Sequence, residues 1–387
     1  MSNHTLKLTD TEVLIHARNR LQEHLPLQAG GYKASAEDLF NVLLSVAVNR
    51  DTLETVCADL EIDLSAETLR GYYKAQLRRE GLPQLEQALN QALQAELPKV
   101  LWKKAQKMAI DLHDRPYYGK QPQADGLWVT GQLRAGTNRV YRVATAYVIR
   151  DGLRLNLAIH FVQPHETALQ ILQALLERLQ KMQLKMARLF LDKGFDGIEE
   201  LAYLQDQDIP AVVACTIRGK TGGTKALCRG RKSYRTPYTF KGRKREFSAQ
   251  LAVCRVFTTN KRTGRMKRKA SWMIFVLIHC DLTPQQAKQQ YRYRFGIETS
   301  YRCAGKVRGW TTSPNPAYRF LLIGLAFFLV NVWVHLRWLL SHPTGRGRRK
   351  TDFKCFRLSR LAKFIRRALE RFYGCAHQIS TPDPPLP

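Results

Sequence analysis

The sequence predicts a protein of the α/β class, because its pattern of apolar residues changes along the chain. Residues 1–100 carry apolar side chains at the i, i+3 and i+4 spacing of helices. From Lys107 onward the chain contains runs rich in Val, Tyr, Ile and Thr, which are typical of strands. Beyond His165, helical segments alternate with short apolar strands. We therefore expect a helical N-terminal region followed by a core of mixed helices and strands.

The charge of the chain points to a polyanionic partner. Of its 387 residues, 62 are Lys or Arg and 32 are Asp or Glu, which gives a formal net charge of +30. Such an excess opposes compaction unless a polyanion neutralises it. Nucleic acid is the expected partner, and an anionic membrane surface is the alternative. With 44% hydrophobic residues, the chain is long enough for two or three domains, each with its own core.

The cysteines and the apolar runs limit the possible compartments. The 8 cysteines form no Cys-x-x-Cys pair and the histidines are not clustered, so neither a zinc site nor a disulfide framework is indicated. The N-terminus is polar and lacks the apolar segment of a signal peptide. The run 320–340 is interrupted by Asn331, His335 and Arg337, so we expect a buried helix and no membrane span. Together with the unpaired pattern of cysteines, this predicts a protein of the reducing cytoplasm, and its basic charge predicts association with the nucleoid.

The N-terminal region contains a candidate helix-turn-helix. Residues 34–47 are amphipathic, and Asp51 is the expected N-cap of the next helix, with Glu54 three residues later. The segments 52–60 and 65–79, joined by a short turn, have the lengths of this motif. A helical hairpin with a solvated basic face fits the same residues equally well.

If the motif binds DNA, its second helix, which opens at the predicted cap Ser65, supplies the contacts. The candidates for contacting DNA are Thr68, Arg70, Tyr72 and Lys74, with Arg78 and Arg79 for phosphates. A third helix, residues 85–101, precedes the core.

The core begins with predicted antiparallel strands. A strand from Lys107 ends at Asp111, and strands at 125–130, 139–149 and 153–162 follow, with an Asp-Gly turn before the last.

Helices and strands then alternate. We expect an amphipathic helix at 165–182, a strand from Met186 that ends at Asp192, a helix at 197–207 and a strand at 209–216. Meandering strands, a helix, a parallel strand, a helix and another strand follow each other in the order of an RNase H-like core.

A basic segment separates this core from the next helix. Residues 217–270 contain 18 Lys or Arg and one acid, Glu246, and interleave aromatic residues with cations. Such a surface suits backbone tracking and base stacking on nucleic acid, and a disordered basic loop is the alternative. Because 249–258 and 271–279 alternate as strands do, we expect a small β insertion.

Residues 291–302 place one carboxylate in an otherwise cationic helix. At 100° per residue, Tyr291, Arg294, Glu298 and Arg302 share about one third of the helix circumference. This face suits an anionic or metallic partner. A surface helix with i±4 ion pairs is the simpler explanation when this helix is considered alone.

Two strand-end acids favour the metallic partner. Asp111, Asp192 and Glu298 are together the parts of a divalent-metal site that acts on phosphodiesters. Asp114 is an alternative to Asp111 at the first position. Taken singly, Asp111 also fits a turn acid, and Asp192 fits an N-cap or turn residue before Gly194.

These motifs resemble those of the DDE transposases of prokaryotic insertion sequences. Asp192-Lys-Gly-Phe is similar to the second-aspartate motif of that family, and Asp111 to its first aspartate. Tyr291, Arg294 and Glu298 match the signature of the IS-four branch and its ISH-three subgroup. The lysine of that signature is expected where this chain has Gly305, and Lys306 follows one place later. The similarity covers about residues 105–340.

The resemblance implies the chemistry and the partners. Asp111, Asp192 and Glu298 would hold two Mg²⁺ ions, which Mn²⁺ could replace. The same site would cut the transposon ends and then join each 3′-OH to target DNA. The partners would be double-stranded DNA, as terminal inverted repeats and target, and a second copy of the chain bound on DNA. The expected DNA contacts are Tyr291, Arg294, Arg302, Lys306, Arg70, Lys74, Arg243, Lys244 and Arg245.

The expected organisation has five segments: a helical DNA-binding domain at 1–100, core at 105–216, a basic β insertion at 217–270, core with the Glu298 helix at 271–342, and a basic tail and helix at 343–387. Two other functions remain open. An RNase H-like nuclease or resolvase needs the same three acids, and a DNA-binding regulator needs only the helical region and a degenerate core.

Overall fold

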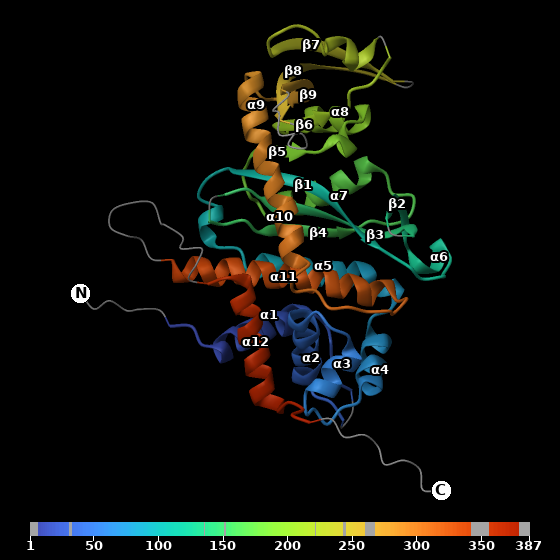
Figure 1. Cartoon of the computed structure of the whole chain (residues 1–387), viewed down its shortest axis with the longest axis vertical. Helices are drawn as coiled ribbons and strands as arrows, with labels where there is room; N and C mark the ends of the chain where they lie inside the picture. The colour runs from blue at the N-terminus through green and yellow to red at the C-terminus, as the bar shows by residue number, and fades with distance from the viewer. Residues whose placement is uncertain are drawn as a thin grey trace, which may run out of the picture. The chain divides into compact units, whose positions relative to one another are not determined.

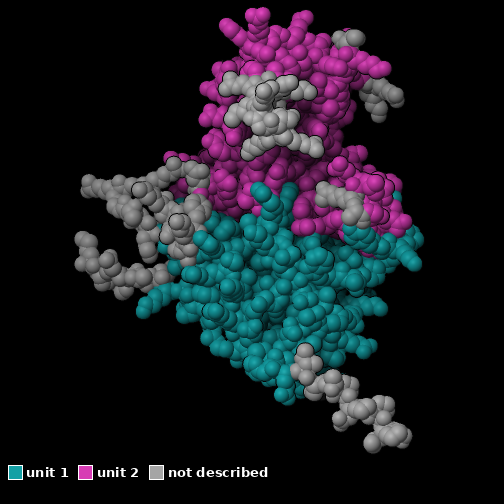
Figure 2. All heavy atoms as spheres, viewed as in Figure 1, with its two compact units in different colours: residues 1–97, 118–127, 300–387 teal, residues 98–117, 128–299 magenta. Residues whose placement is uncertain are grey.

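The computed structural model describes residues 7–30, 33–134, 136–150, 152–220, 222–242, 245–259, 268–341 and 356–378. The chain divides into two compact units (Figure 2). The helical unit comprises residues 1–97, 118–127 and 300–387, and the sheet unit comprises residues 98–117 and 128–299. Each unit is described below by itself.

The sheet unit is built on one mixed sheet in the order β2-β3-β1-β5-β6-β9-β8-β7, with β4 also paired to β3 (Figure 1). The strands are β1 (Gln106–Pro116), β2 (Val129–Arg134), β3 (Thr137–Val148), β4 (Asn156–Phe161), β5 (Met186–Leu191), β6 (Ala211–Cys215), β7 (Tyr234–Lys241), β8 (Glu246–Thr259) and β9 (Arg268–Ile278). β1 lies between antiparallel β3 and parallel β5, and β6 continues in parallel.

The RNase H-like order predicted from the sequence is confirmed. β1, β3 and β4 form the antiparallel part, and α7 (Ala168–Lys181) and α8 (Ile198–Asp206) lead into β5 and out of it. α7 buries an apolar stripe against β3 and β4, as its helical periodicity predicts. The parallel pairing of β5 with β1 requires a crossover of this kind, since no hairpin joins parallel strands.

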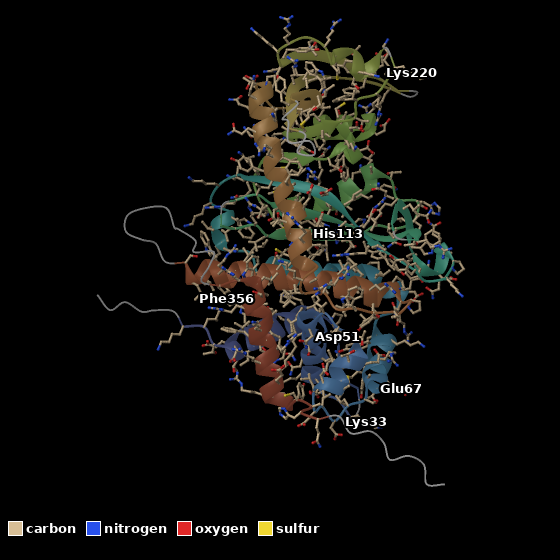
Figure 3. The ribbon with its side chains drawn as sticks, viewed as in Figure 1. Lys33, Asp51, Glu67, His113, Lys220 and Phe356 are labelled. Atoms are coloured by element: carbon tan, nitrogen blue, oxygen red, sulfur yellow. The ribbon has the colours of Figure 1, made fainter. Side chains whose placement is uncertain are left out.

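Two strand boundaries differ from the prediction. β1 does not end at Asp111 but continues through His113 to Pro116, because β3 pairs with it along its whole second half (Figure 3). The strand expected at 125–130 starts only at Val129. Residues Gln123–Gly126 form the short helix α6 instead, which ends at Leu127 in a left-handed conformation.

The basic region forms strands, as predicted, but these extend the core sheet rather than build a separate one. β9 pairs antiparallel with β6, and β8 and β7 follow outward. Residues 274–278 of β9 form a buried apolar run, and they pair residue by residue with the apolar strand β6. Both strands can therefore be buried in the same sheet. β7 has alternating half-buried and exposed residues and carries Pro237, which an edge strand tolerates.

The cationic segment around Glu298 is not one uninterrupted α-helix. α9 (Pro284–Tyr291) is followed by the 3₁₀ turn η6 (Arg292–Arg294) and then by α10 (Phe295–Ala304). α9 starts with a Thr283 capping box and packs on β8 (Figure 1). A 3₁₀ turn winds more tightly than an α-helix, so Arg294 is rotated from its expected position.

The helical unit contains α1 (Asp10–His24), α2 (Ala36–Asn49), α3 (Leu53–Asp59), α4 (Ala66–Gln76), α5 (Leu82–Ala95), α11 (Pro316–Leu340) and α12 (Leu358–Tyr373). The predicted cap Ser65 accepts a hydrogen bond from Thr68 N. The predicted cap Asp51 is wrong: Thr52 caps α3, and the Asp51 carboxylate accepts a hydrogen bond from Thr52 N.

The C-terminal helix packs on the first helices rather than forming a separate tail. α12 lies on α1 and α2, and the Tyr373 hydroxyl donates to Asp38 Oδ1 at 2.6 Å and accepts from Asn41 at 3.1 Å. Periodicity marks α12 as amphipathic, but only these long-range contacts determine which surface it covers.

The long apolar run predicted to be a buried helix is α11. By length and composition it could cross a membrane, but 83% of its most apolar window is buried inside the structure, as expected for a core helix. Its N-cap is Asn315, whose side chain accepts hydrogen bonds from Ala317 N and Tyr318 N.

Candidate active site

The register of two parallel strands brings the first two predicted acids together. Ile110 of β1 pairs with Leu191 of β5, and this is the last pair between these strands. Asp111 and Asp192 are the next residues of the two strands. Because neighbouring strands lie about 4.8 Å apart, the two carboxylates start from adjacent positions at the point where the strands separate.

Asp111 is a buried carboxylate held by two donors. It is 8% exposed; its Oδ1 accepts from Leu112 N at 2.9 Å and its Oδ2 from Arg294 Nη1 at 2.8 Å. Burial raises the pKa of Asp111 to about 6, against the opposing effect of the Arg294 charge, and the negative charge of Asp192 adds to the rise. A cation bound beside these acids would offset both effects, because it stabilises the ionised carboxylate.

Asp192 has a structural contact as well. Its Oδ1 accepts from Gly194 N at 2.9 Å and so caps the short 3₁₀ turn Lys193–Phe195. A Cβ at position 194 would lie 3.0 Å from that oxygen, so a side chain there would crowd the carboxylate. The cap predicted as an alternative role is therefore present, and Gly194 keeps the carboxylate in its position.

Arg294 interacts with all three acids, two of them by direct contact. Its guanidinium contacts Asp111 at 2.8 Å and Glu298 Oε1 at 3.3 Å. Burial alone would lower the pKa of Arg294, but the Tyr291 phenol and the charges of Asp111, Asp192 and Glu298 raise it. One cation thus contacts two of the predicted acids and is influenced electrostatically by the third, Asp192.

The three carboxylates do not meet as closely as ligands of one ion. Across the described ranges, the only group of three His, Cys, Asp or Glu residues with ligand atoms within 4.8 Å of one another lies elsewhere. Arg294 takes the space between Asp111 and Glu298. The donor set still fits a divalent cation of the Mg²⁺ class, because such ions prefer carboxylate oxygens and keep several waters between themselves and the protein.

Tyr291 and Asp114 do not lie where a site residue would need to be. Tyr291 is 4% exposed and packs against Phe190 and Phe275, so it supports Arg294 from the core instead of presenting its ring at an open surface. Asp114 is three residues from Asp111 and so projects from the other face of β1. Its carboxylate forms a bidentate ion pair with Arg142 at 2.7 and 2.8 Å.

Asp196 is a buried acid that the sequence analysis missed. Its Oδ2 accepts from Thr216 N at 2.6 Å and its Oδ1 from Arg218 at 2.8 Å. These contacts tie the turn after Asp192 to the end of β6. Asp196 is therefore a positioning residue, and its only signal in the sequence is its place four residues after a strand-end aspartate.

The predicted DNA contacts are mostly exposed. Arg302 is exposed on α10 and Lys306 just after it. Arg245 precedes β8 and forms exposed ion pairs with Glu199 and Asp206 of α8. Arg243 and Lys244 lie outside the described residues.

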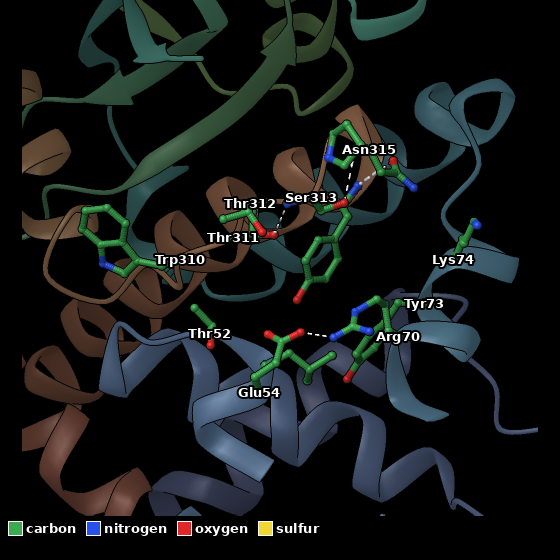
Figure 4. Close-up of a pocket in the computed structure, with 13 residues that line it drawn as sticks. Thr52, Glu54, Arg70, Tyr73, Lys74, Trp310, Thr311, Thr312, Ser313 and Asn315 are labelled. Atoms are coloured by element: carbon green, nitrogen blue, oxygen red, sulfur yellow. Dashed lines mark hydrogen bonds and ion pairs between the residues drawn. The ribbon is translucent and has the colours of Figure 1, made fainter. Parts of the chain in front are cut away.

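Arg70 and Lys74 line a cavity of about 440 Å³ in the helical unit (Figure 4). Arg70 forms an ion pair with Glu54, so α3 and α4 are linked across it. The loop 310–315 forms the opposite side, held where Trp310 N donates to Asp51 O and Asn315 Nδ2 to Leu77 O. Basic and aromatic groups therefore meet beside the second helix of the predicted helix-turn-helix.

The comparisons with known proteins agree with this geometry. A search of curated proteins found no match. The structure of a piggyBac transposase synaptic complex with hairpin DNA is similar in fold: the TM-score is 0.53, the identity is 10%, and the match covers 95% of this chain and 78% of the other. The family model described as a transposase DDE domain matches residues 103–317, which contain all three acids. Because this match spans more than half of the chain, the protein belongs to the transposase DDE domain family, whose members are enzymes that cleave and join DNA.

Proposed function

We propose that this DNA transposase acts for an insertion sequence, with Asp111, Asp192 and Glu298 as its catalytic metal-holding residues. The observation that carries this assignment is the convergence of the three acids on Arg294 from β1, the end of β5 and α10. We assign the chain to the IS-four branch, because Tyr291, Arg294 and Glu298 have the spacing of its signature.

The carboxylates would hold two Mg²⁺ ions, which Mn²⁺ could replace. The bound ions would supply an activated oxygen nucleophile and charge stabilisation at the phosphate. Asp111 is a buried carboxylate next to Asp192, so an added cation would stabilise its ionised form together with Arg294. The Glu298 side chain is 50% exposed, so its carboxylate would be accessible to a bound strand.

Arg294 would change partners during the reaction. Arg294 pairs with Asp111 and Glu298, and its Nε is buried with no partner among the described atoms. Once cations balance the acids, its planar guanidinium can donate to a phosphate. Arg294 thus neutralises the site before DNA arrives and orients the backbone afterwards.

The same site would perform both steps. Water first breaks a phosphodiester bond at the transposon end and leaves a 3′-OH and a 5′-phosphate. The 3′-OH then attacks a target phosphodiester, forms the new bond and displaces a target 3′-oxygen. In this way one phosphodiester bond is formed for each target bond that breaks.

The proposed partners are terminal inverted repeats, target DNA and a second copy of the chain on DNA. The solved transposase of similar fold was determined as a synaptic complex with hairpin DNA, which supports an assembly on DNA ends. The net charge of +30 supplies the electrostatic attraction. Arg302, Lys306, Arg70, Lys74 and Arg245 are the described cations that we assign to it.

The test is a strand-transfer assay with DNA from the ends of the element, a target plasmid and Mg²⁺. We expect wild-type protein to join the ends covalently to the plasmid, and Asp111→Asn, Asp192→Asn and Glu298→Gln each to abolish cutting while DNA affinity persists at low salt. Asp208→Asn, at a 91% exposed acid, is the matched control. Cutting without joining would favour a nuclease, and cutting unaffected by Glu298→Gln would refute the assignment.

A further inference from the structure

A polar cluster of the helical unit has no part in the transposition chemistry. It consists of His16 on α1, Glu96 at the C-cap of α5 and His335 on α11. His16 Nε2 lies 3.0 and 3.2 Å from the two Glu96 oxygens, and His335 Nδ1 lies 2.9 Å from Oε2. His335 is one of the residues that interrupt the apolar run of α11, so the fold places a costly polar group here.

We propose that His16, Glu96 and His335 form a Zn²⁺ site that links α1, α5 and α11. Two imidazoles and one carboxylate are a usual zinc ligand set, with water as the fourth ligand. Zinc–ligand bonds of about 2.0–2.2 Å at tetrahedral angles separate the ligand atoms by about 3.3–3.5 Å. The three ligand atoms here already lie within 4.8 Å of one another, so shifts of less than about 1 Å would complete the site.

The charge of Glu96 favours a bound cation. Glu96 is 0% exposed, and both of its oxygens contact an imidazole nitrogen. A buried carboxylate is costly unless a cation or hydrogen-bond donors balance it, and a bound metal ion at this place would supply that balance.

One cation already approaches this carboxylate but does not fill the site. Arg20 Nε lies 3.6 Å from Glu96 Oε1, is 38% exposed and also pairs with Glu23. A carboxylate has two oxygens, so one oxygen of Glu96 can bind an ion while the other accepts a hydrogen bond from Arg20. Hydrogen bonds of this kind, made behind a metal ligand, commonly orient that ligand.

The surrounding helices hold the ligands before any ion binds. Asn331 Nδ2, one turn before His335 on α11, donates to Leu93 O on α5 at 3.2 Å. The side chains of His16 and His335 are 25% and 17% exposed, so both imidazoles are partly accessible to solvent. Nitrogen ligands favour Zn²⁺ over Mg²⁺, so this site would not compete for the ions of the acidic site.

The experiment is a titration of metal-free, full-length protein with Zn²⁺ in excess Mg²⁺, followed by calorimetry, and with Co²⁺ as a spectroscopic substitute for Zn²⁺. We expect one ion per chain, the absorption bands of tetrahedral Co²⁺ without thiolate charge transfer, and a higher melting temperature with Zn²⁺. His16→Ala and His335→Ala should each weaken binding by at least about 100-fold, since even outer contacts are worth 10–100-fold.

Controls separate this site from the acidic site and from misfolding. Glu298→Gln should bind Zn²⁺ as wild type does, and so should His279→Ala, a histidine of the sheet unit. His16→Gln and His335→Gln keep a hydrogen-bond donor if the alanine variants do not fold. Wild-type protein that binds no stoichiometric Zn²⁺, or binding unchanged in the His16 and His335 variants, overturns the proposal.

Discussion

Arg294 Nη1 donates a 2.8 Å hydrogen bond to Asp111 Oδ2, although 183 residues separate the two in the chain. This ion pair fixes the turn before α10 against the middle of β1. It is also buried, with 9% and 11% of the two side chains exposed. Arg294 is therefore a buried counter-ion of Asp111, one of the three acids of the proposed site.

Removal of Arg294 should destabilise the fold strongly. Arg294→Ala leaves Asp111 buried without its cation, and loss of one partner of a buried pair costs about 3–5 kcal/mol. Urea unfolding should show this loss, with part of it recovered in millimolar Mg²⁺. Arg292→Ala, at an exposed position of the same 3₁₀ turn, is the control. Equal stability of the two variants would mean that the ion pair contributes nothing.

The raised pKa of Asp111 predicts a pH dependence of stability. The folded-state pKa is about 6 and the ordinary value is 3.8, so between these values the folded state holds the proton more tightly than the unfolded state. The contribution of Asp111 to the free energy of unfolding is greatest below about pH 4. It decreases as the pH rises through 6 and is constant above that, with a total loss of about 3 kcal/mol.

The comparison that isolates this effect is the free energy of unfolding of wild type minus that of Asp111→Asn, measured from pH 3.5 to 7 without divalent ions. Asparagine cannot titrate, so the difference should carry the whole slope. A difference that stays flat across this range would show that Asp111 has an ordinary pKa in the folded protein.

A methyl group at position 194 should impair the site without unfolding the protein. The Cβ of Gly194→Ala would lie 3.0 Å from Asp192 Oδ1, so the carboxylate must shift by a few tenths of an ångström. Displacement of catalytic groups on the ångström scale costs up to about 100-fold in rate, and we expect strand cutting to fall at least tenfold. Gly222→Ala, where a Cβ meets nothing within 4 Å, should retain the wild-type rate.

The salt dependence of DNA binding tests the cavity-lining cations. If Arg70 and Lys74 each contact a phosphate, Arg70→Ala and Lys74→Ala should each reduce the slope of log affinity against log salt by about 1. Fluorescence anisotropy with duplex DNA at several salt concentrations gives this slope. Lys181→Ala, at a 73% exposed residue of α7, is the comparison. Slopes that match wild type would place both residues outside the DNA interface.

Local pattern determined much of the fold. The apolar runs that end near Asp111 and Asp192 predicted β1 and β5, and the alternation after Glu246 predicted β8 and β9. Ser65 was identified as a cap from its residue type. These features depend on residues within a few positions of each other, and the hydrogen bonds and side-chain spacing of helices and strands are equally local.

Local pattern failed where a choice depended on distant partners. Thr52 rather than Asp51 caps α3, and Tyr291 turned into the core against Phe190 and Phe275. The basic strands joined the main sheet because β6 offered a matching edge. Periodicity gives the apolar face of each such segment but not the surface that covers it.

The sequence by itself determined that this protein is a basic α/β chain with two strand-end aspartates and a glutamate in a cationic helical segment. The tertiary structure decided that Arg294 lies among those acids, and that His16, Glu96 and His335 meet at all. The physical reason is that charges interact through space. Strand register and helix packing set their separations, and no spacing along the chain encodes them.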